Sequence, residues 1–66
     1  MQIVVNGTRE SIPEGSSVAD LVRLHGLAES PCAVEVNREL VTRSLHGDRR
    51  LRDGDVVEIV TLVGGG

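Results

Sequence analysis

The feature that most limits the fold is an apolar run near the carboxyl end, residues 56–63, with hydrophobic side chains at both odd and even positions. Successive side chains of a strand point to opposite faces, so Val57 and Ile59 share one face and Val56 and Val60 the other. A strand with aliphatic residues on both faces is usually central in its sheet. We therefore expect this run to be the middle strand, with strands on either side of it.

Shorter aliphatic segments supply candidate neighbours for that strand: residues 2–6, 8–12, 33–37 and 40–41. Asn6 and Gly7 both tolerate positive φ, so they predict a two-residue hairpin turn between the first two segments. Pro13 cannot donate to a strand ladder and is expected to end the second segment.

One amphipathic helix is predicted over residues 18–25. Its aliphatic residues recur at helical spacing: Val18, Leu21 and Val22. Ser17 followed by Asp20 is a shortened form of the capping box. Gly26 is expected to end the helix in a left-handed conformation, with Leu27 packed against Val22.

The order of hairpin, helix and further strands favours an α+β fold, a small mixed sheet with one helix across it. In that arrangement the first and last strands run parallel in the middle. We expect residues 1–63 to form the domain and residues 64–66 a flexible tail. Residues 42–50 are polar and irregular, with Leu45 as the obvious anchor and a short helical turn near Ser44.

Composition excludes several classes of function. With 66 residues, a net charge of −3 and no aromatic side chain, the chain offers neither a basic surface nor stacking platforms for nucleic acid. No apolar stretch approaches a membrane span, and no signal peptide is recognised. Cys32 has no partner for a disulfide, which fits a reducing compartment. We expect a cytoplasmic protein that binds neither nucleic acid nor membrane.

Catalytic and metal-binding patterns are weak. Cys32 would need a base such as His25 or His46 to act as a nucleophile, and the spacing does not bring them together. The same three residues lack the close pairing of zinc ligands. Cys32 as a small buried hydrophobe is the simpler interpretation. We expect no enzyme and no metal site.

Basic and acidic residues alternate before the last strand. Three arginines, Arg49, Arg50 and Arg52, are balanced by three aspartates, Asp48, Asp53 and Asp55. The segment is either a solvated loop or a surface for an acidic partner.

The last strand leads into Gly64, Gly65 and Gly66. Glycines neither pack nor resist bending, so they form either an ordinary frayed end or an arm, about 10 Å long, that threads a partner's active site. The carboxylate of Gly66 is then the reactive group. A carboxylate is a poor acyl donor, and its activation as an adenylate requires a partner that uses ATP and magnesium.

A second candidate site is an apolar patch. Val4, Val60 and Leu62 point away from the predicted core face and would form an exposed patch if the first and last strands are neighbours. Such a patch marks a partner site, or it is edge packing under residues 42–50.

These segments together resemble a known family. Val34-Glu35-Val36-Asn37, then Asp53-Gly54-Asp55 leading into residues 57–61 and a Gly-Gly end, is similar to the ThiS family, the sulfur carriers of thiamine biosynthesis. Pro13-Glu14-Gly15 and the following helix start also fit, so the resemblance covers essentially the whole chain.

The resemblance implies a ubiquitin-like β-grasp fold and a function as a sulfur carrier. Gly66 would be adenylated by an E1-like adenylyltransferase and converted to a thiocarboxylate, with sulfur from a cysteine desulfurase persulfide, and thiazole synthase would use that sulfur. The carrier itself would bind no cofactor. Two alternatives stay open: the related carrier for molybdopterin synthesis, which also ends in Gly-Gly, and a TGS-like β-grasp binding module.

Overall fold

The computed structural model describes residues 1–62. The predicted end of the last strand at Val63 and the predicted tail of Gly64, Gly65 and Gly66 lie outside the described residues.

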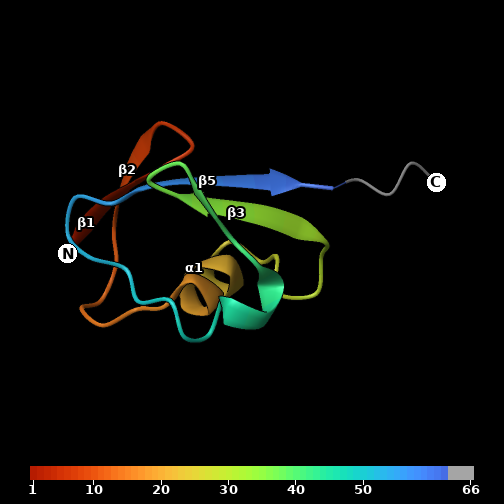
Figure 1. Ribbon diagram of the computed structural model, residues 1–66. Helices are drawn as coiled ribbons and strands as arrows, with labels where there is room; N and C mark the ends of the chain where they lie inside the picture. The colour runs from red at the N-terminus through yellow and green to blue at the C-terminus, as the bar shows by residue number, and fades with distance from the viewer. Residues whose placement is uncertain (63–66) are drawn as a thin grey trace.

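A five-stranded mixed sheet forms the framework (Figure 1). Its strands follow the spatial order β2-β1-β5-β3-β4. Their bounds are β1 (Gln2–Val5), β2 (Thr8–Ser11), β3 (Cys32–Val36), β4 (Glu39–Val41) and β5 (Val56–Thr61). β5 is central, parallel to β1 and antiparallel to β3. The predicted α+β fold, with parallel first and last strands in the middle, is confirmed.

Two tight turns join the antiparallel pairs. Asn6 and Gly7 have φ values of 49° and 83°, as the hairpin prediction requires. Between β3 and β4 the turn uses Asn37 and Arg38, with φ values of 52° and 69°. Arg38 is therefore held in the left-handed region without the freedom of a glycine.

Helix α1 (Val18–Leu24) lies across one face of the sheet (Figure 1). Ser17 and Asp20 form the predicted capping box, each side chain accepting the other's backbone N–H. The Leu27 N–H donates to Val22 and the Gly26 N–H to Arg23, which is the Schellman ending expected of a left-handed glycine. The helix ends at Leu24, one residue earlier than predicted.

The hydrophobic core fills the space between α1 and the sheet. It contains Ile3, Val5, Ile12, Val18, Leu21, Val22, Val34, Val36, Val41, Leu51, Val57 and Ile59. All are aliphatic, so the core is built from many small contacts. Because α1 covers one face only, the opposite face of the sheet stays open.

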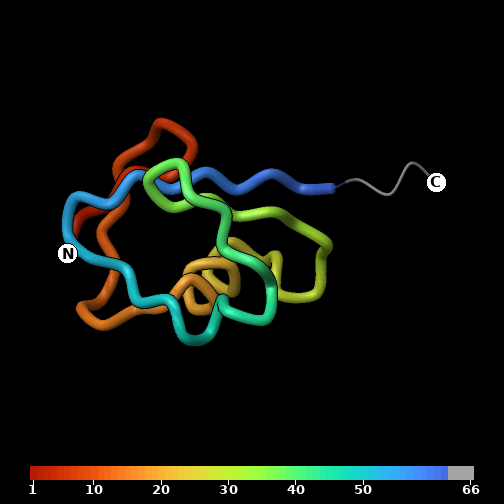
Figure 2. The backbone as a smooth tube through the Cα atoms, viewed as in Figure 1, coloured from red at the N-terminus to blue at the C-terminus, as the bar shows by residue number. Residues whose placement is uncertain are grey.

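Residues 42–55 pass along α1 and return to the start of β1 (Figure 2). They include the 3₁₀ helix η1 (Arg43–Leu45), which fits the helical turn predicted near Ser44. The prediction that Leu45 anchors this segment is wrong, because its side chain is 51% exposed. His46 is the anchor: it is buried, and its Nε2–H donates to the Val41 carbonyl at 3.0 Å.

Within residues 1–62 no helix has the length and apolar character needed to cross a membrane.

Candidate partner-binding site

The strand that leads to the glycine run remains paired to its last described residue. Thr61 lies opposite Cys32 in the β3–β5 register, and the Leu62 N–H donates to the Pro31 carbonyl at 2.9 Å. β3 therefore supports the whole described end of β5. The predicted tail begins from an ordered strand.

On its other side β5 pairs with β1 as far as Val57, and beyond that point one side chain holds it. β1 ends at Val5, and beyond it the Asn6 amide takes over: its Oδ1 accepts the Ile59 N–H at 2.8 Å, and its Nδ2 donates to the Ile59 carbonyl at 3.2 Å. The side chain thus replaces a peptide group of β1 and extends the ladder by one step. Residues 60–62 then project past β1 with β3 as their strand neighbour.

The start of β5 is fixed by a second polar cluster. Asn37 exchanges two hydrogen bonds with Val56, through its backbone N–H and its side-chain oxygen. Its amide also donates to the buried carboxylate of Asp55, whose other oxygen accepts the Arg52 N–H. Asp53 accepts the N–H of Gln2. The Asp53-Gly54-Asp55 turn therefore joins the starts of β1 and β5.

The open face of the sheet carries the candidate docking surface. We call this the outer face, formed on the side away from α1 by Leu40 of β4, Glu35 of β3, and Val56, Glu58 and Val60 of β5 with the following Leu62. Val60 lies opposite Ala33, and Leu40 and Glu58 both lie opposite Glu35. The side chains of Leu40, Val60 and Leu62 are 66%, 55% and 54% exposed. Among residues 1–62 this is an apolar surface with acidic residues within it.

The three predicted patch residues do not lie together. Val60 and Leu62 share the exposed end of the outer face. Val4 lies on the same face but opposite Val56, four residues before Val60, or about 13 Å along the strand, and it is half-buried. Residues 42–50 do not cover Val60 or Leu62, because they bond to α1 on the other side of the sheet.

The structure brings Cys32 and His46 to one hollow, but each candidate base has another hydrogen-bond partner. Cys32 is half-buried, and both it and His46 line a hollow of about 230 Å³ beside Arg43. The His46 Nε2–H is engaged with a backbone carbonyl, while His25 pairs through Nε2 with the Glu10 carboxylate at 2.8 Å. Among the described residues no three His, Cys, Asp or Glu side chains gather as metal ligands would.

The arginine-rich segment is not neutralised by its aspartates. Arg50 donates to the Gly15 carbonyl and Arg49 to the Arg50 carbonyl. Asp53 and Asp55 accept backbone N–H groups instead, and within residues 1–62 neither forms an ion pair. The segment is therefore held by hydrogen bonds to the backbone.

Sequence reasoning missed Asn6 as a clamp and the facing of Glu35 and Glu58. The turn alone explained why residue 6 is an asparagine, and nothing in the sequence indicates its hydrogen bonds to Ile59. Each glutamate alternates with aliphatic residues in its own strand, but their meeting depends on the register of β3 against β5.

Comparison with known proteins gives consistent matches across the chain. The family model described as the ThiS family matches residues 2–66. A crystal structure of the thiamine biosynthesis protein (ThiS) from Geobacter metallireducens superposes with a TM-score of 0.84, at 30% identity and full coverage of both chains. A solution structure of a thiamine biosynthesis protein from the same organism gives 0.82 at 30% identity, covering all of this chain and 88% of that one.

Two curated relatives are named thiazole synthase. The protein of Paramagnetospirillum magneticum is 35% identical and that of Magnetococcus marinus 33% identical, each over 66 residues. The match takes in all of this chain but only 20% of either relative. The chain thus spans about a fifth of the length of these relatives.

Proposed function

Because the chain belongs to the ThiS family, we propose that it is a sulfur carrier of thiamine biosynthesis whose reactive group is the carboxylate of Gly66. The observation that carries the proposal is the family match over residues 2–66, which includes the glycine run as well as the folded domain. The agreement in fold with the Geobacter metallireducens protein supports it independently. In this proposal the chain is a co-substrate, and its own residues catalyse nothing.

The chemistry proceeds in three steps on partner enzymes. An E1-like adenylyltransferase joins the Gly66 carboxylate to AMP, using ATP and magnesium and releasing pyrophosphate. A persulfide derived from a cysteine desulfurase then attacks the acyl carbon, and AMP leaves. A thiol finally reduces the sulfur–sulfur bond of the acyl persulfide, which leaves the thiocarboxylate on Gly66 and a disulfide on the partner.

Thiazole synthase is the proposed acceptor of this sulfur. Both relatives named thiazole synthase contain a stretch similar to the whole of this chain. A carrier and the enzyme that consumes its sulfur must meet, so a shared polypeptide is one way to bring them together. That similarity is the support for this partner.

Gly64 and Gly65 have a steric role in the proposal. The adenylate and the thiocarboxylate react with water unless the partner excludes it, so the acyl end must enter a narrow site. Residues without side chains can pass where larger residues would not. Val60 and Leu62, at the exposed end of the outer face, are proposed to contact the partner's surface beside that entrance.

Intact-mass spectrometry tests the assignment. The chain is incubated with the cognate adenylating enzyme, ATP, magnesium and a sulfur donor, and its mass should rise by the difference between a sulfur and an oxygen atom. Fragmentation should locate the change at Gly66. A variant extended by one residue after Gly66 is the control and should stay unchanged, and an unmodified wild-type chain beside an enzyme active on another carrier would overturn the proposal.

A further inference from the structure

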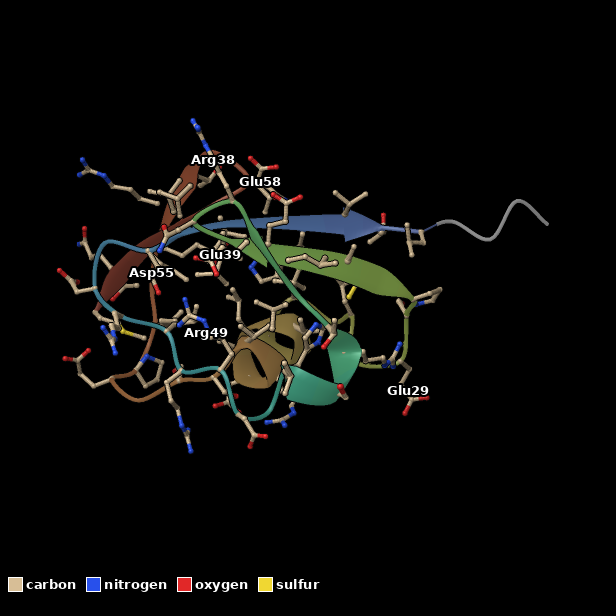
Figure 3. The ribbon with its side chains drawn as sticks, viewed as in Figure 1. Glu29, Arg38, Glu39, Arg49, Asp55 and Glu58 are labelled. Carbon is tan, nitrogen blue, oxygen red and sulfur yellow. The ribbon has the colours of Figure 1, made fainter. Side chains whose placement is uncertain are left out.

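The hollow that Cys32 lines lies between α1, the connection to β3 and η1, and its volume is about 230 Å³. Its lining also includes one histidine, His46, and two arginines, Arg23 and Arg43. Among residues 1–62 no acidic side chain lines it, although the chain has a net charge of −3. Glu29 belongs to the connection from α1 to β3, and Figure 3 shows its side chain extending away from α1 and the sheet. The hollow is therefore a basic site on an acidic chain.

His46 presents one nitrogen of a buried ring to this hollow. The residue is 8% exposed, and its Nε2–H donates to the Val41 carbonyl, so the neutral ring has Nδ1 as a hydrogen-bond acceptor. Nδ1 forms no hydrogen bond within residues 1–62. Because no buried side-chain nitrogen or oxygen in that range lacks a partner, Nδ1 is open to the surface, and the hollow is the opening that His46 lines. The hollow therefore contains an unpaired base.

The two arginines give the hollow its positive charge. Arg23 is paired with the Asp20 carboxylate at 3.3 Å, whereas Arg43 forms no ion pair within residues 1–62. The Arg43 Nη2 donates to the Ala28 carbonyl at 3.4 Å, which leaves most of its five N–H donors unused. A guanidinium with unused donors suits a carboxylate, which it can bind through two parallel hydrogen bonds. The hollow is therefore suited to a molecule that carries a carboxylate.

Size and reactivity narrow the class of that molecule. Pockets for drug-sized ligands are about 300–1,000 Å³, so this hollow takes a smaller one. The half-buried Cys32 lines the hollow, and its thiolate form would be the nucleophile. Thr61 lies opposite Cys32 in the β3–β5 register, so a group attached to Cys32 would lie beside the end of β5.

We infer that the hollow binds small disulfides that carry a carboxylate, and that Cys32 reacts with them to form a mixed disulfide. Arg43 holds the carboxylate, and Nδ1 of His46 takes the proton of the Cys32 thiol. The Cys32 sulfur attacks one sulfur of the bound disulfide, whose sulfur–sulfur bond breaks as the new one forms. The other half leaves as a thiolate, which takes up the proton. One disulfide is consumed and one is formed, so no further oxidant is needed.

Two probes of similar size and opposite charge test the inference. Dithiodipropionate carries a carboxylate at each end, and cystamine carries an ammonium at each end. Intact-mass spectrometry follows the reaction, in which the chain gains one half of the probe and loses it again on reduction. Each rate constant is divided by that of the same chain unfolded in urea, because the two probes differ in intrinsic reactivity.

The corrected rate should be about fivefold higher for dithiodipropionate than for cystamine, as expected for one ion pair at a partly exposed site. Added salt should reduce this ratio, because it screens the arginines. The net charge of −3 would by itself favour cystamine, so the direction of the preference separates the hollow from the charge of the whole chain. A corrected ratio of one or less would overturn the inference.

Arg43→Gln and Arg9→Gln form a matched pair of variants. Each removes one positive charge from an exposed side chain, but Arg9 lies on the edge strand β2 and does not line the hollow. Arg43→Gln should lower the corrected ratio about threefold, because the carboxylate loses its partner, while Arg9→Gln should leave it unchanged. Equal ratios in the two variants would show that the preference does not come from the hollow and would overturn the assignment.

Discussion

Single polar residues decide where the strand leading to the glycine run is held. The Asn6 side chain accepts from and donates to Ile59. The Asn37 side chain accepts the Val56 N–H, and the Asn37 backbone N–H donates to the Val56 carbonyl. Both asparagines sit in tight turns at positive φ, where their short amides reach the neighbouring strand. Each therefore serves as turn residue and strand clamp at once.

Replacing Asn6 by glycine isolates the clamp, because glycine keeps the left-handed turn and removes only the amide. We expect a loss of about 1–2 kcal/mol in the free energy of unfolding, from two hydrogen bonds of ordinary strength. The sharper measurement is amide hydrogen exchange, in which the Ile59 N–H should lose protection while the Val34 N–H does not. Unchanged exchange at Ile59 would show that the clamp contributes nothing.

Asp20 gives a prediction about pH. The Ser17 backbone N–H, with the Ser17 side chain as a second cause, holds the pKa of the Asp20 carboxyl below its ordinary value of 3.8. A lowered folded-state pKa stabilises the fold above pH 3.8, and that stabilisation is lost as the pH falls through the folded-state pKa.

We therefore expect Asp20→Asn to lower the urea midpoint at pH 7 and to have a smaller effect well below pH 3.8. Asp48→Asn serves as control and should leave the midpoint unchanged at pH 7, since Asp48 is exposed and forms no ion pair within residues 1–62. An effect of Asp20→Asn that is constant with pH would contradict the assignment.

Among the elements, residues 42–50 contribute to the start of α1, which their polar sequence does not indicate. The carbonyls of His46 and Arg49 accept the N–H groups of Ala19 and Val18 at the start of α1. Those N–H groups have no partner within a helix. The segment therefore caps the helix with its backbone, which explains why a polar and irregular stretch is held in place.

His46 and Leu45 offer a direct comparison. His46→Ala should lower the free energy of unfolding by about 1–3 kcal/mol, because the Val41 carbonyl loses its partner in a buried place. Leu45→Ala should stay within about 0.5 kcal/mol, because the side chain is exposed. Chemical denaturation measures both, and the opposite ranking would restore Leu45 as the anchor.

For the whole molecule, the two faces of the sheet have different tasks. One face of the sheet and α1, with Ile12 and Leu51 from the connecting segments, form the aliphatic core, and the outer face contributes no residue to it. Substitutions on the outer face can therefore change binding without unfolding the domain. That division suits a small domain, whose stability margin is narrow.

Ile59 and Val60 are neighbours in the chain on opposite faces, which makes them a matched pair. Ile59→Ala should cost about 2–5 kcal/mol in unfolding free energy, as expected for a buried aliphatic residue. Val60→Asp should leave thermal unfolding within about 0.5 kcal/mol of wild type and weaken binding to the adenylating enzyme. A large loss of stability in Val60→Asp would place that side chain in the core instead.

Much of the fold follows from local patterns in the sequence. Residues 56–61 predicted a central strand because apolar residues occur at both odd and even positions. Asn6-Gly7 predicted the hairpin because both residues accept positive φ. Ser17 and Asp20 set the start of α1, and Gly26 set its end, through hydrogen bonds between residues no more than five positions apart. Such features need no knowledge of distant residues.

The tertiary structure decided what depends on register and on long-range contact. The clamp from Asn6 to Ile59 joins residues 53 positions apart, and the opposition of Glu35 and Glu58 exists only because β3 pairs with β5 in one register out of several. A slip of one residue would turn each side chain to the other face. Sequence alone therefore identified the strand that leads to the glycine run. Only the tertiary structure showed which residues of other strands and turns contact that strand.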